Sequence, residues 1–327
     1  MKTKLITLLA VMLVAMIVAG CKATSVPSDD DPRPLVVATT TMLEDMARQL
    51  GGDVVRVEGI MSPGSDPHLY QPRPGDARLM AKSQMVVMNG LFLEGWIEGL
   101  VRHAGGERRI VVASENITPI AMRDSPGGVD PHFWFDILAW RTASESVGQA
   151  MVELVGPKTA QGAIIRQRSA DYAALLERLH SWIEVQLATI PSNQRVLVTS
   201  HDAFNYFGRA YSIDVEAIQG ISTEQEASQR DVANMIDLVR KRNAPAVFVE
   251  TSVNPSLINQ VGRATGARVA GPLFSDSIGV AGGPADTFVK TVVENVRMIT
   301  EALGGQYTPF ELASQPIIEE GETRSGS

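Results

Sequence analysis

Short apolar runs rich in β-branched residues alternate with helix-like stretches along most of this 327-residue chain. A first set of strand-like runs lies at 35–40, 54–60, 85–90 and 109–114. A second set lies at 195–200, 215–218, 246–251 and 268–274. Stretches such as MLEDMARQLGG, DARLMAKS and QRDVANMIDLVRKRN separate these runs and have helical periodicity. This βαβα order predicts an α/β fold in which two lobes each hold a parallel sheet with helices on both faces.

The segment between the two sets, 158–190, has no strand or turn signal. Its apolar positions recur at spacings of three and four, at Tyr172, Leu176, Leu179, Ile183 and Leu187. That spacing predicts one amphipathic helix, which Pro191 would close. At 1.5 Å per residue the helix would be about 45 Å long, which is enough to span both lobes.

The N-terminal residues MKTKLITLLAVMLVAMIVAGC have a basic start and then an apolar run that ends at Ala19. The run is short for a transmembrane span and is typical of a signal peptide. It ends in VAGC, which resembles the lipobox of bacterial lipoproteins. The resemblance implies that Cys21, the single cysteine of the chain, becomes a lipidated mature N-terminus that carries palmitate or a similar chain.

These observations divide the chain into six parts. We expect a signal peptide at 1–20, a polar tether at 21–34, an N-terminal lobe at 35–157, a connecting helix at 158–190, a C-terminal lobe at 191–310 and a disordered tail at 311–327. The formal net charge of −8 argues against nucleic acid as a partner.

Two histidines follow Asp-Pro pairs in closely similar local sequences. His68 lies in GSDPHLYQPRPGD after the second strand, and His132 lies in GVDPHFWFD after the fourth strand of the first lobe. In the second lobe, His201 follows the first strand and Asp276 follows the last. Ligands of open parallel sheets bind beyond the carboxyl ends of the strands, so a cleft between the lobes would bring these four side chains together.

Three imidazoles and one carboxylate suit zinc and neighbouring divalent metals. A set of four would fill a tetrahedral shell and leave no position for a substrate, which favours a carrier over an enzyme. Aromatic residues would wall the cleft, namely Tyr70, Phe133, Trp134, Phe204 and Tyr206. We expect His103 and His180 to be exposed or capping residues on helices.

Five segments carry a resemblance to a known family: GSDPHLYQPRPGD, DPHFWFD, VTSHDAFNYFGRAY, GISTEQEASQRDVANMIDLVRKRNAPAVFVET and GPLFSDSIG. From about residue 35 to 303 the chain resembles the metal-receptor family of ABC transporters, the zinc/manganese solute-binding lipoproteins. The resemblance implies two Rossmann-like lobes joined by a long backbone helix, with one divalent cation buried between them. It implies ligand roles for His68, His132, His201 and Asp276, and delivery of the ion to a membrane permease driven by an ATPase.

The resemblance also bears on the metal. Many manganese receptors of the family have Glu where this chain has His201, so the His-rich set favours zinc. The segment before His132 lacks the long His-rich loop of many zinc importers, which keeps manganese as the second choice. Two other functions stay open: a zinc-dependent hydrolase with Glu224 or Glu250 as base, although no HExxH spacing exists, and a surface adhesin. We expect a monomeric, non-enzymatic receptor that is lipid-anchored on the extracytoplasmic or periplasmic face of the membrane.

Overall fold

The computed structural model describes residues 31–122 and 127–312. The predicted signal peptide, Cys21 and nearly all of the predicted tail lie outside those ranges. The chain divides into two units after Arg33. In the described part of the first unit, the Arg33 guanidinium pairs with the Asp31 carboxylate at 2.6 Å. All further description concerns the second unit, which begins at Pro34.

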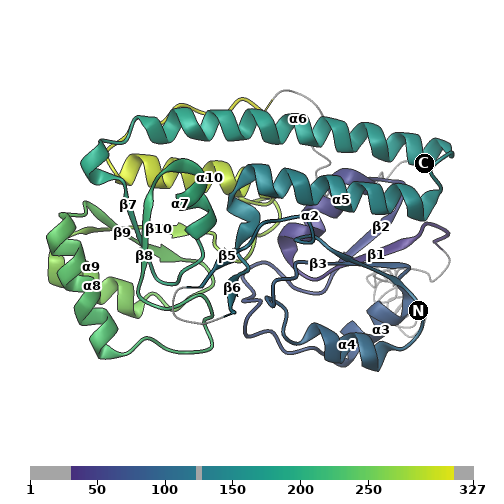
Figure 1. Cartoon of the computed structure of the whole chain (residues 1–327), viewed down its shortest axis with the longest axis horizontal. Helices are drawn as coiled ribbons and strands as arrows, with labels where there is room; N and C mark the ends of the chain where they lie inside the picture. The colour runs from purple at the N-terminus through teal and green to yellow at the C-terminus, as the bar shows by residue number, and fades with distance from the viewer. Residues whose placement is uncertain (1–30, 123–126, 313–327) are drawn as a thin grey trace, which may run out of the picture. The chain divides into compact units, whose positions relative to one another are not determined.

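The first lobe, called lobe one below, is built on a four-stranded parallel sheet in the order β2-β1-β3-β4 (Figure 1). Its strands are β1 (Leu35–Ala38), β2 (Arg56–Gly59), β3 (Met85–Met88) and β4 (Arg109–Val112). Every residue of the central strand β1 is buried, as expected for a strand covered on both faces. The helices of this lobe are α2 (Thr41–Gly51), α3 (Pro74–Lys82) and α4 (Ile97–Ala104).

An antiparallel strand pair follows β4 and was not predicted. It consists of β5 (Ile120–Ala121) and β6 (Val129–Asp130), and the short 3-10 helix η1 (Phe133–Phe135) comes directly after it. His132 lies between β6 and η1, so this pair and not β4 itself positions the second histidine. Strands of two residues carry too little apolar periodicity to be recognised from sequence.

Two long antiparallel helices come next, α5 (Ile137–Val155) and α6 (Ala160–Ala188). Both have side-chain N-caps: Asp136 accepts from the backbone N–H of Ala139, and Thr159 from that of Gly162. The helices approach so closely at Gly148 that a Cβ atom there would lie 2.4 Å from Oγ of Ser169.

Helix α6 is the predicted connecting helix. It contacts α2 of lobe one on one side, and α7 (Asn205–Tyr211) and α10 (Phe288–Ala302) on the other (Figure 1). The five predicted apolar positions are all buried. Burial of each such side chain contributes roughly 1.5–3 kcal/mol to the hydrophobic free energy of folding, which holds this helix against both lobes.

The second lobe, called lobe two below, contains two parallel strand pairs, β7 with β8 and β9 with β10, and β7 lies beside β9. The strands are β7 (Val196–Thr199), β8 (Asp214–Ala217), β9 (Ala246–Glu250) and β10 (Arg268–Leu273). Helices α7, α8 (Gln229–Arg242), α9 (Ser256–Thr265) and α10 complete it. The register between β9 and β10 shifts between Ala270 and Leu273, where Pro272 has no N–H to donate to the ladder.

One continuous apolar core runs through both lobes. It includes Met46 of α2, Trp140 of α5, Leu176 of α6, Phe248 of β9 and Phe288 of α10. The predicted two-lobe α/β architecture with a long connecting helix is therefore confirmed, but the lobes share packed helices as well as a connection. In residues 31–122 and 127–312, no helix combines the length and apolar character that crossing a membrane requires.

Asp45 is a buried carboxyl group where α2 meets α10, and its Oδ2 accepts a hydrogen bond from the backbone N–H of Phe288 at 2.9 Å. Burial raises the pKa of this carboxyl to about 6, although the Phe288 N–H and the Gln49 side chain act in the opposite direction. The pKa of Asp45 is higher in the folded protein than in the unfolded chain, where it is 3.8. The protonated carboxyl group therefore contributes fully to the free energy of unfolding below pH 3.8, and this contribution is lost as the pH rises toward 6.

The variant Asp45→Asn removes this ionisation and keeps an oxygen that can accept from Phe288. Relative to the wild type, its free energy of unfolding should increase between about pH 4 and pH 6, and the difference should level off at roughly 3 kcal/mol. Urea unfolding of both metal-free proteins at several pH values measures this difference. A difference that does not change with pH would contradict the assignment.

Candidate metal centre

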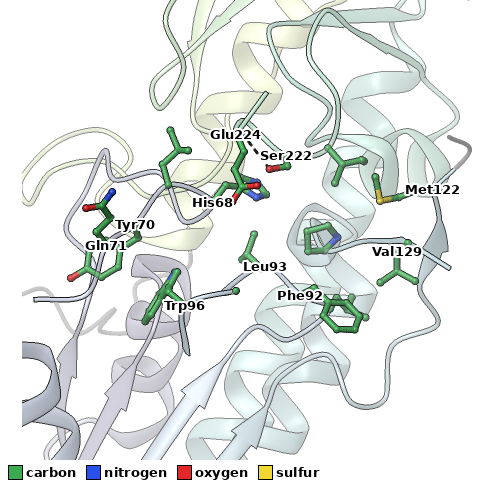
Figure 2. Close-up of a pocket in the computed structure, with 16 residues that line it drawn as sticks. His68, Tyr70, Gln71, Phe92, Leu93, Trp96, Met122, Val129, Ser222 and Glu224 are labelled. Carbon is green, nitrogen blue, oxygen red and sulfur yellow. Dashed lines mark hydrogen bonds between the residues drawn. The ribbon is translucent and has the colours of Figure 1, made fainter. Parts of the chain in front are cut away.

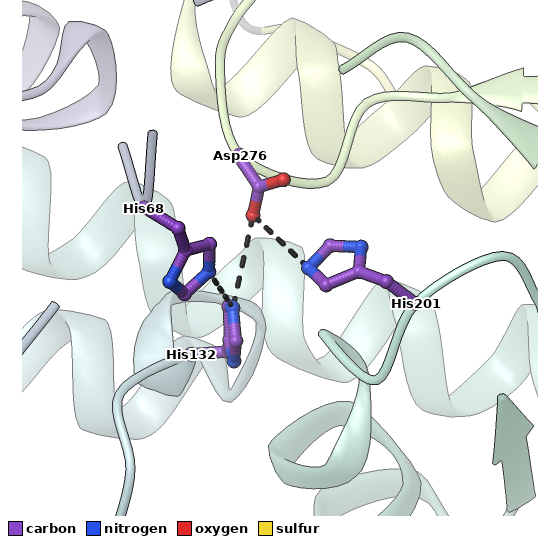
Figure 3. A group of neighbouring side chains, drawn as sticks. All are labelled: His68, His132, His201 and Asp276. Atoms are coloured by element: carbon purple, nitrogen blue, oxygen red, sulfur yellow. Dashed lines mark hydrogen bonds and ion pairs between the residues drawn. The ribbon is translucent and has the colours of Figure 1, made fainter. Parts of the chain in front are cut away.

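The structure brings His68, His132, His201 and Asp276 together between the two lobes (Figure 3). His68 lies in the loop after β2 and His132 directly after β6, whereas His201 follows β7 and Asp276 follows β10. One ligand atom from each residue lies within 4.8 Å of the other three. The carboxyl ends of strands in both lobes thus deliver their polar side chains to one point, as the sequence predicts.

The atoms that meet are three imidazole Nε2 atoms and one carboxylate oxygen. Nε2 of His132 is 3.2 Å from Nε2 of His68, and Oδ1 of Asp276 lies 3.8 Å from His132 and 3.6 Å from His201. The two distances to Asp276 are too long for hydrogen bonds. The same distances leave room between the donor atoms for a small cation bound at about 2.0–2.2 Å from each.

Burial makes this arrangement costly without a cation. His132 and His201 are 0% exposed and Asp276 is 1% exposed, whereas His68 is partly exposed. Among the described residues, Nε2 of His201 and Oδ1 of Asp276 find no hydrogen-bond partner. A buried polar atom without a partner costs about 1–3 kcal/mol, and a bound cation would satisfy both atoms at once.

The Asp residue of each Asp-Pro-His frame fixes the histidine two positions later. Oδ1 of Asp66 accepts the backbone N–H of His68 at 2.8 Å, and Oδ1 of Asp130 accepts that of His132 at 2.9 Å. Asp130 also accepts from Nδ1 of His132 at 2.8 Å. Because a carboxylate only accepts, that ring carries its proton on Nδ1, and the Nε2 lone pair faces the centre.

Glu250, at the end of the neighbouring strand β9, fixes the backbone and the ring of His201. Its Oε1 accepts the backbone N–H groups of Ser200 and His201 at 2.7 and 2.9 Å, and its Oε2 accepts from Nδ1 of His201 at 2.6 Å. Sequence reasoning placed Glu250 only as a candidate hydrolase base. The usable signal was its position at the end of a strand adjacent to the strand that precedes His201.

Asp276 is oriented through its second oxygen. Oδ2 accepts from Oγ of Ser252 at 2.7 Å and from Oγ of Ser275 at 3.2 Å, so that Oδ1 faces the histidines. Neither serine was predicted, because Ser in a loop carries no distinctive pattern. Trp134 adds a link across the lobes, since its Nε1 donates to the carbonyl of Ser275 at 2.9 Å.

The charges of the centre are strongly coupled. Burial, together with the adjacent His132 ring, lowers the pKa of His68 to about 3. Burial also disfavours the charged form of His201, but the carboxylates of Asp276 and Glu250 outweigh it and raise its pKa to about 10. Burial opposes ionisation of Asp276 as well, yet the three imidazoles hold its pKa below the usual value. Without metal, the group thus favours a protonated His201 opposite an ionised Asp276, and a metal ion must displace that proton.

The five predicted wall aromatics take different positions. Trp134 packs edge-on against His132 with ring centroids 5.1 Å apart, and the Tyr206 hydroxyl donates to the Asp130 carbonyl at 2.9 Å. Tyr70 packs on Trp96 beside the His68 loop. Phe133 instead packs against Trp140 of α5, and Phe204 stacks on Phe135, so these two support the wall from the core side.

The other two histidines lie apart from this group. His103 is exposed in the last turn of α4, and its Nδ1 contacts the Gly99 carbonyl at 2.6 Å. His180 is partly buried on α6, and its Nδ1 contacts the Tyr211 hydroxyl at 3.0 Å. The predicted exposed or capping role holds for His103, whereas His180 makes a tertiary contact to α7.

Comparison with known proteins agrees with this geometry. Residues 36–302 match the family described as zinc-uptake complex component A, periplasmic (ZnuA). The zinc-binding protein TroA of Treponema pallidum is 35% identical over 84% of this chain and 90% of its own length. Its solved structure matches with a TM-score of 0.78 at 32% identity, covering 83% of this chain and 99% of that one.

Two further relatives have different metals in their names. The manganese-binding lipoprotein MntA of Bacillus subtilis is 34% identical over 90% of this chain and 97% of its own length. The iron-binding protein YfeA of Yersinia pestis is 30% identical over 89% of this chain and 93% of its own length. With a family match over most of its length and relatives above 30% identity, the chain belongs to the ZnuA family, the metal-binding periplasmic receptors of ABC transporters.

Proposed function

We propose that this protein captures one divalent cation outside the cytoplasm through His68, His132, His201 and Asp276, and delivers it to the permease of an ABC transporter. One observation carries the proposal: four potential ligand atoms converge in a buried site, and two of them find no hydrogen-bond partner among the described residues. The family membership supports delivery to a permease and its ATPase. We propose that the protein works as a monomer.

A hydrolytic role has less support. Both oxygens of Glu250 are occupied by Ser200 and His201, so this carboxylate orients a ring and is not free to activate water. Glu224 is exposed, and the four donors would complete a tetrahedral shell around zinc. The relatives are named as metal-binding proteins or as substrate-binding lipoproteins of metal ABC transporters, which supports a receptor.

Zinc is the metal we propose first and manganese second. Affinity for nitrogen-rich sites rises from Mn(II) to Zn(II). Oδ2 of Asp276 is held by two serine hydroxyls, which favours binding through Oδ1 alone and a shell of four. Manganese prefers more oxygen ligands, which this carboxylate provides only by leaving Ser252 and Ser275.

Elemental analysis of protein purified without added metal tests the choice. We expect about one equivalent of zinc per chain, and a competition titration in which manganese displaces zinc only at large excess. If equal concentrations of manganese displaced zinc, the ranking would be reversed. If no metal bound at all, the proposed function itself would fail.

The roles of the donors and of their support can be separated by substitution. His201→Ala should remove most of the rise in melting temperature that zinc produces, because the unfolded chain cannot assemble ligands from both lobes. Glu250→Gln keeps an oxygen for the two backbone N–H groups, but its amide NH₂ faces Nδ1. The His201 ring then favours its proton on Nε2 and cannot bind metal, so zinc affinity should fall at least about tenfold. Thermal unfolding with and without zinc measures the first effect, and calorimetric titration with zinc measures the second.

His103→Ala and His180→Ala are the matched controls, since each removes an imidazole that lies outside the centre. Both should keep wild-type affinity for zinc. A loss of affinity in these controls as large as in His201→Ala would show that the four-residue assignment is wrong.

We also propose a lipid anchor at Cys21, on the strength of VAGC and the polar tether that follows. Cys21→Ala should leave zinc affinity unchanged and should move the protein from the membrane fraction to the soluble fraction, or block its processing. Mass spectrometry of the mature wild-type protein checks the modification directly. An unmodified mature N-terminus would rule the anchor out.

A further inference from the structure

A pocket of about 580 Å³ lies next to the candidate metal centre (Figure 2). Its walls come from both lobes: Tyr70, Phe92 and Trp96 from lobe one, and Ser222 and Glu224 from lobe two. In the part of the chain that the structure describes, His68 is the one residue of the centre that lines it. The pocket therefore connects solvent to His68.

The exposed fractions of the four ligands also differ between the pocket side and the opposite side of the centre. Asp276, His132 and His201 are 1% exposed or less, and each is enclosed by its supporting hydrogen bonds. His68 is the partly exposed member, and it lines the pocket (Figure 2). An ion that comes from solvent along this side meets the His68 imidazole before it meets the other three donors.

Glu224 supplies a negative charge on this path. It is exposed, and it is the one acidic residue among the described residues that line the pocket. Most of the other lining side chains are apolar or aromatic, as Figure 2 shows for Leu93, Met122 and Trp96. Walls of low polarity focus the field of a single carboxylate, which raises the local concentration of cations.

A side-chain hydrogen bond links the segment that carries Glu224 to the His68 loop. The hydroxyl of Thr223, the residue before Glu224, donates to Oδ2 of Asp66 at 2.6 Å. The other oxygen of Asp66 accepts the backbone N–H of His68. Glu224 is thus held one residue from a hydrogen bond that joins the two lobes beside His68.

We propose that the metal ion reaches and leaves the centre through this pocket, with Glu224 as a transient ligand at its mouth and His68 as the first of the four final ligands. This inference rests on the proposed metal-binding function and adds the route and a residue that controls the rate of exchange. A residue on the route that does not contact the bound ion changes both rate constants and leaves the equilibrium nearly unchanged.

Stopped-flow measurements with zinc test the role of Glu224. Trp134 contacts His132, so its fluorescence is a suitable signal, and a chelator chase gives the dissociation rate. Glu224→Gln should slow association and dissociation by the same factor, roughly threefold to tenfold at low salt, with the dissociation constant unchanged within about twofold. Glu226→Gln is the matched control, because it removes the same charge from the same loop at a residue outside the described pocket lining. It should leave both rates at the wild-type value.

A physical block tests the route independently of charge. Cys21 is the single cysteine, so Ser222→Cys in a Cys21→Ser background can be labelled with a bulky maleimide at the pocket wall. The label should slow zinc exchange in both directions by about tenfold or more. The same label on Ala170→Cys, at an exposed position of α6, should have no effect.

The outcomes separate the route from the function. If wild-type protein binds zinc, but neither Glu224→Gln nor the label at position 222 alters exchange, the route is wrong and the metal-binding function stands. The same holds if Glu226→Gln slows exchange as much as Glu224→Gln. If wild-type protein does not bind zinc, the proposed function fails first.

Discussion

Three of the four metal ligands of the candidate centre are held by hydrogen bonds on the side that faces away from it. Asp130 and Glu250 hold protons on the outer nitrogens of His132 and His201, and two serines hold the outer oxygen of Asp276. These contacts direct Nε2 of the two histidines and Oδ1 of Asp276 toward one point in a buried cleft. Burying carboxylates is costly, and the fixed N–H and O–H groups around Asp130, Glu250 and Asp276 offset part of that cost.

The shared core limits how the two lobes can move. Helices α2, α5, α6 and α10 pack against one another and include residues of both lobes in one apolar cluster. A wide hinge opening would expose this surface, at roughly 25 cal/mol for each Å² of apolar area. Small tilts and local movement of the loops that carry His68 and Asp276 would expose less apolar area, because these loops contact the opposite lobe through a few hydrogen bonds, among them Thr223 to Asp66, Gly64 to Ser277 and Trp134 to Ser275. Release of the ion is therefore expected to depend on loops more than on whole lobes.

Periodicity and strand-end position predicted the parallel strands, the long helix and the meeting of four polar side chains, because each depends on local pattern and on a general property of parallel sheets. The same reasoning did not find β5 and β6, which are too short to show a period, nor the link from Trp134 to Ser275, which joins residues 141 positions apart. The duplicated Asp-Pro-His frame was visible in the sequence, but the reason for its Asp was not. Only the folded backbone shows that this carboxylate accepts the N–H group of the histidine two residues later.

That frame divides the centre into two unlike halves. In lobe one, the backbone N–H of each histidine donates to the Asp two residues earlier, so both Asp-Pro-His frames are held by a local contact. In lobe two, His201 relies on a carboxylate 49 residues distant, and Asp276 on a serine 24 residues distant. Substitutions at Glu250 or Ser252 therefore change the position and basicity of His201 or Asp276. His68 and His132 keep their own local contacts.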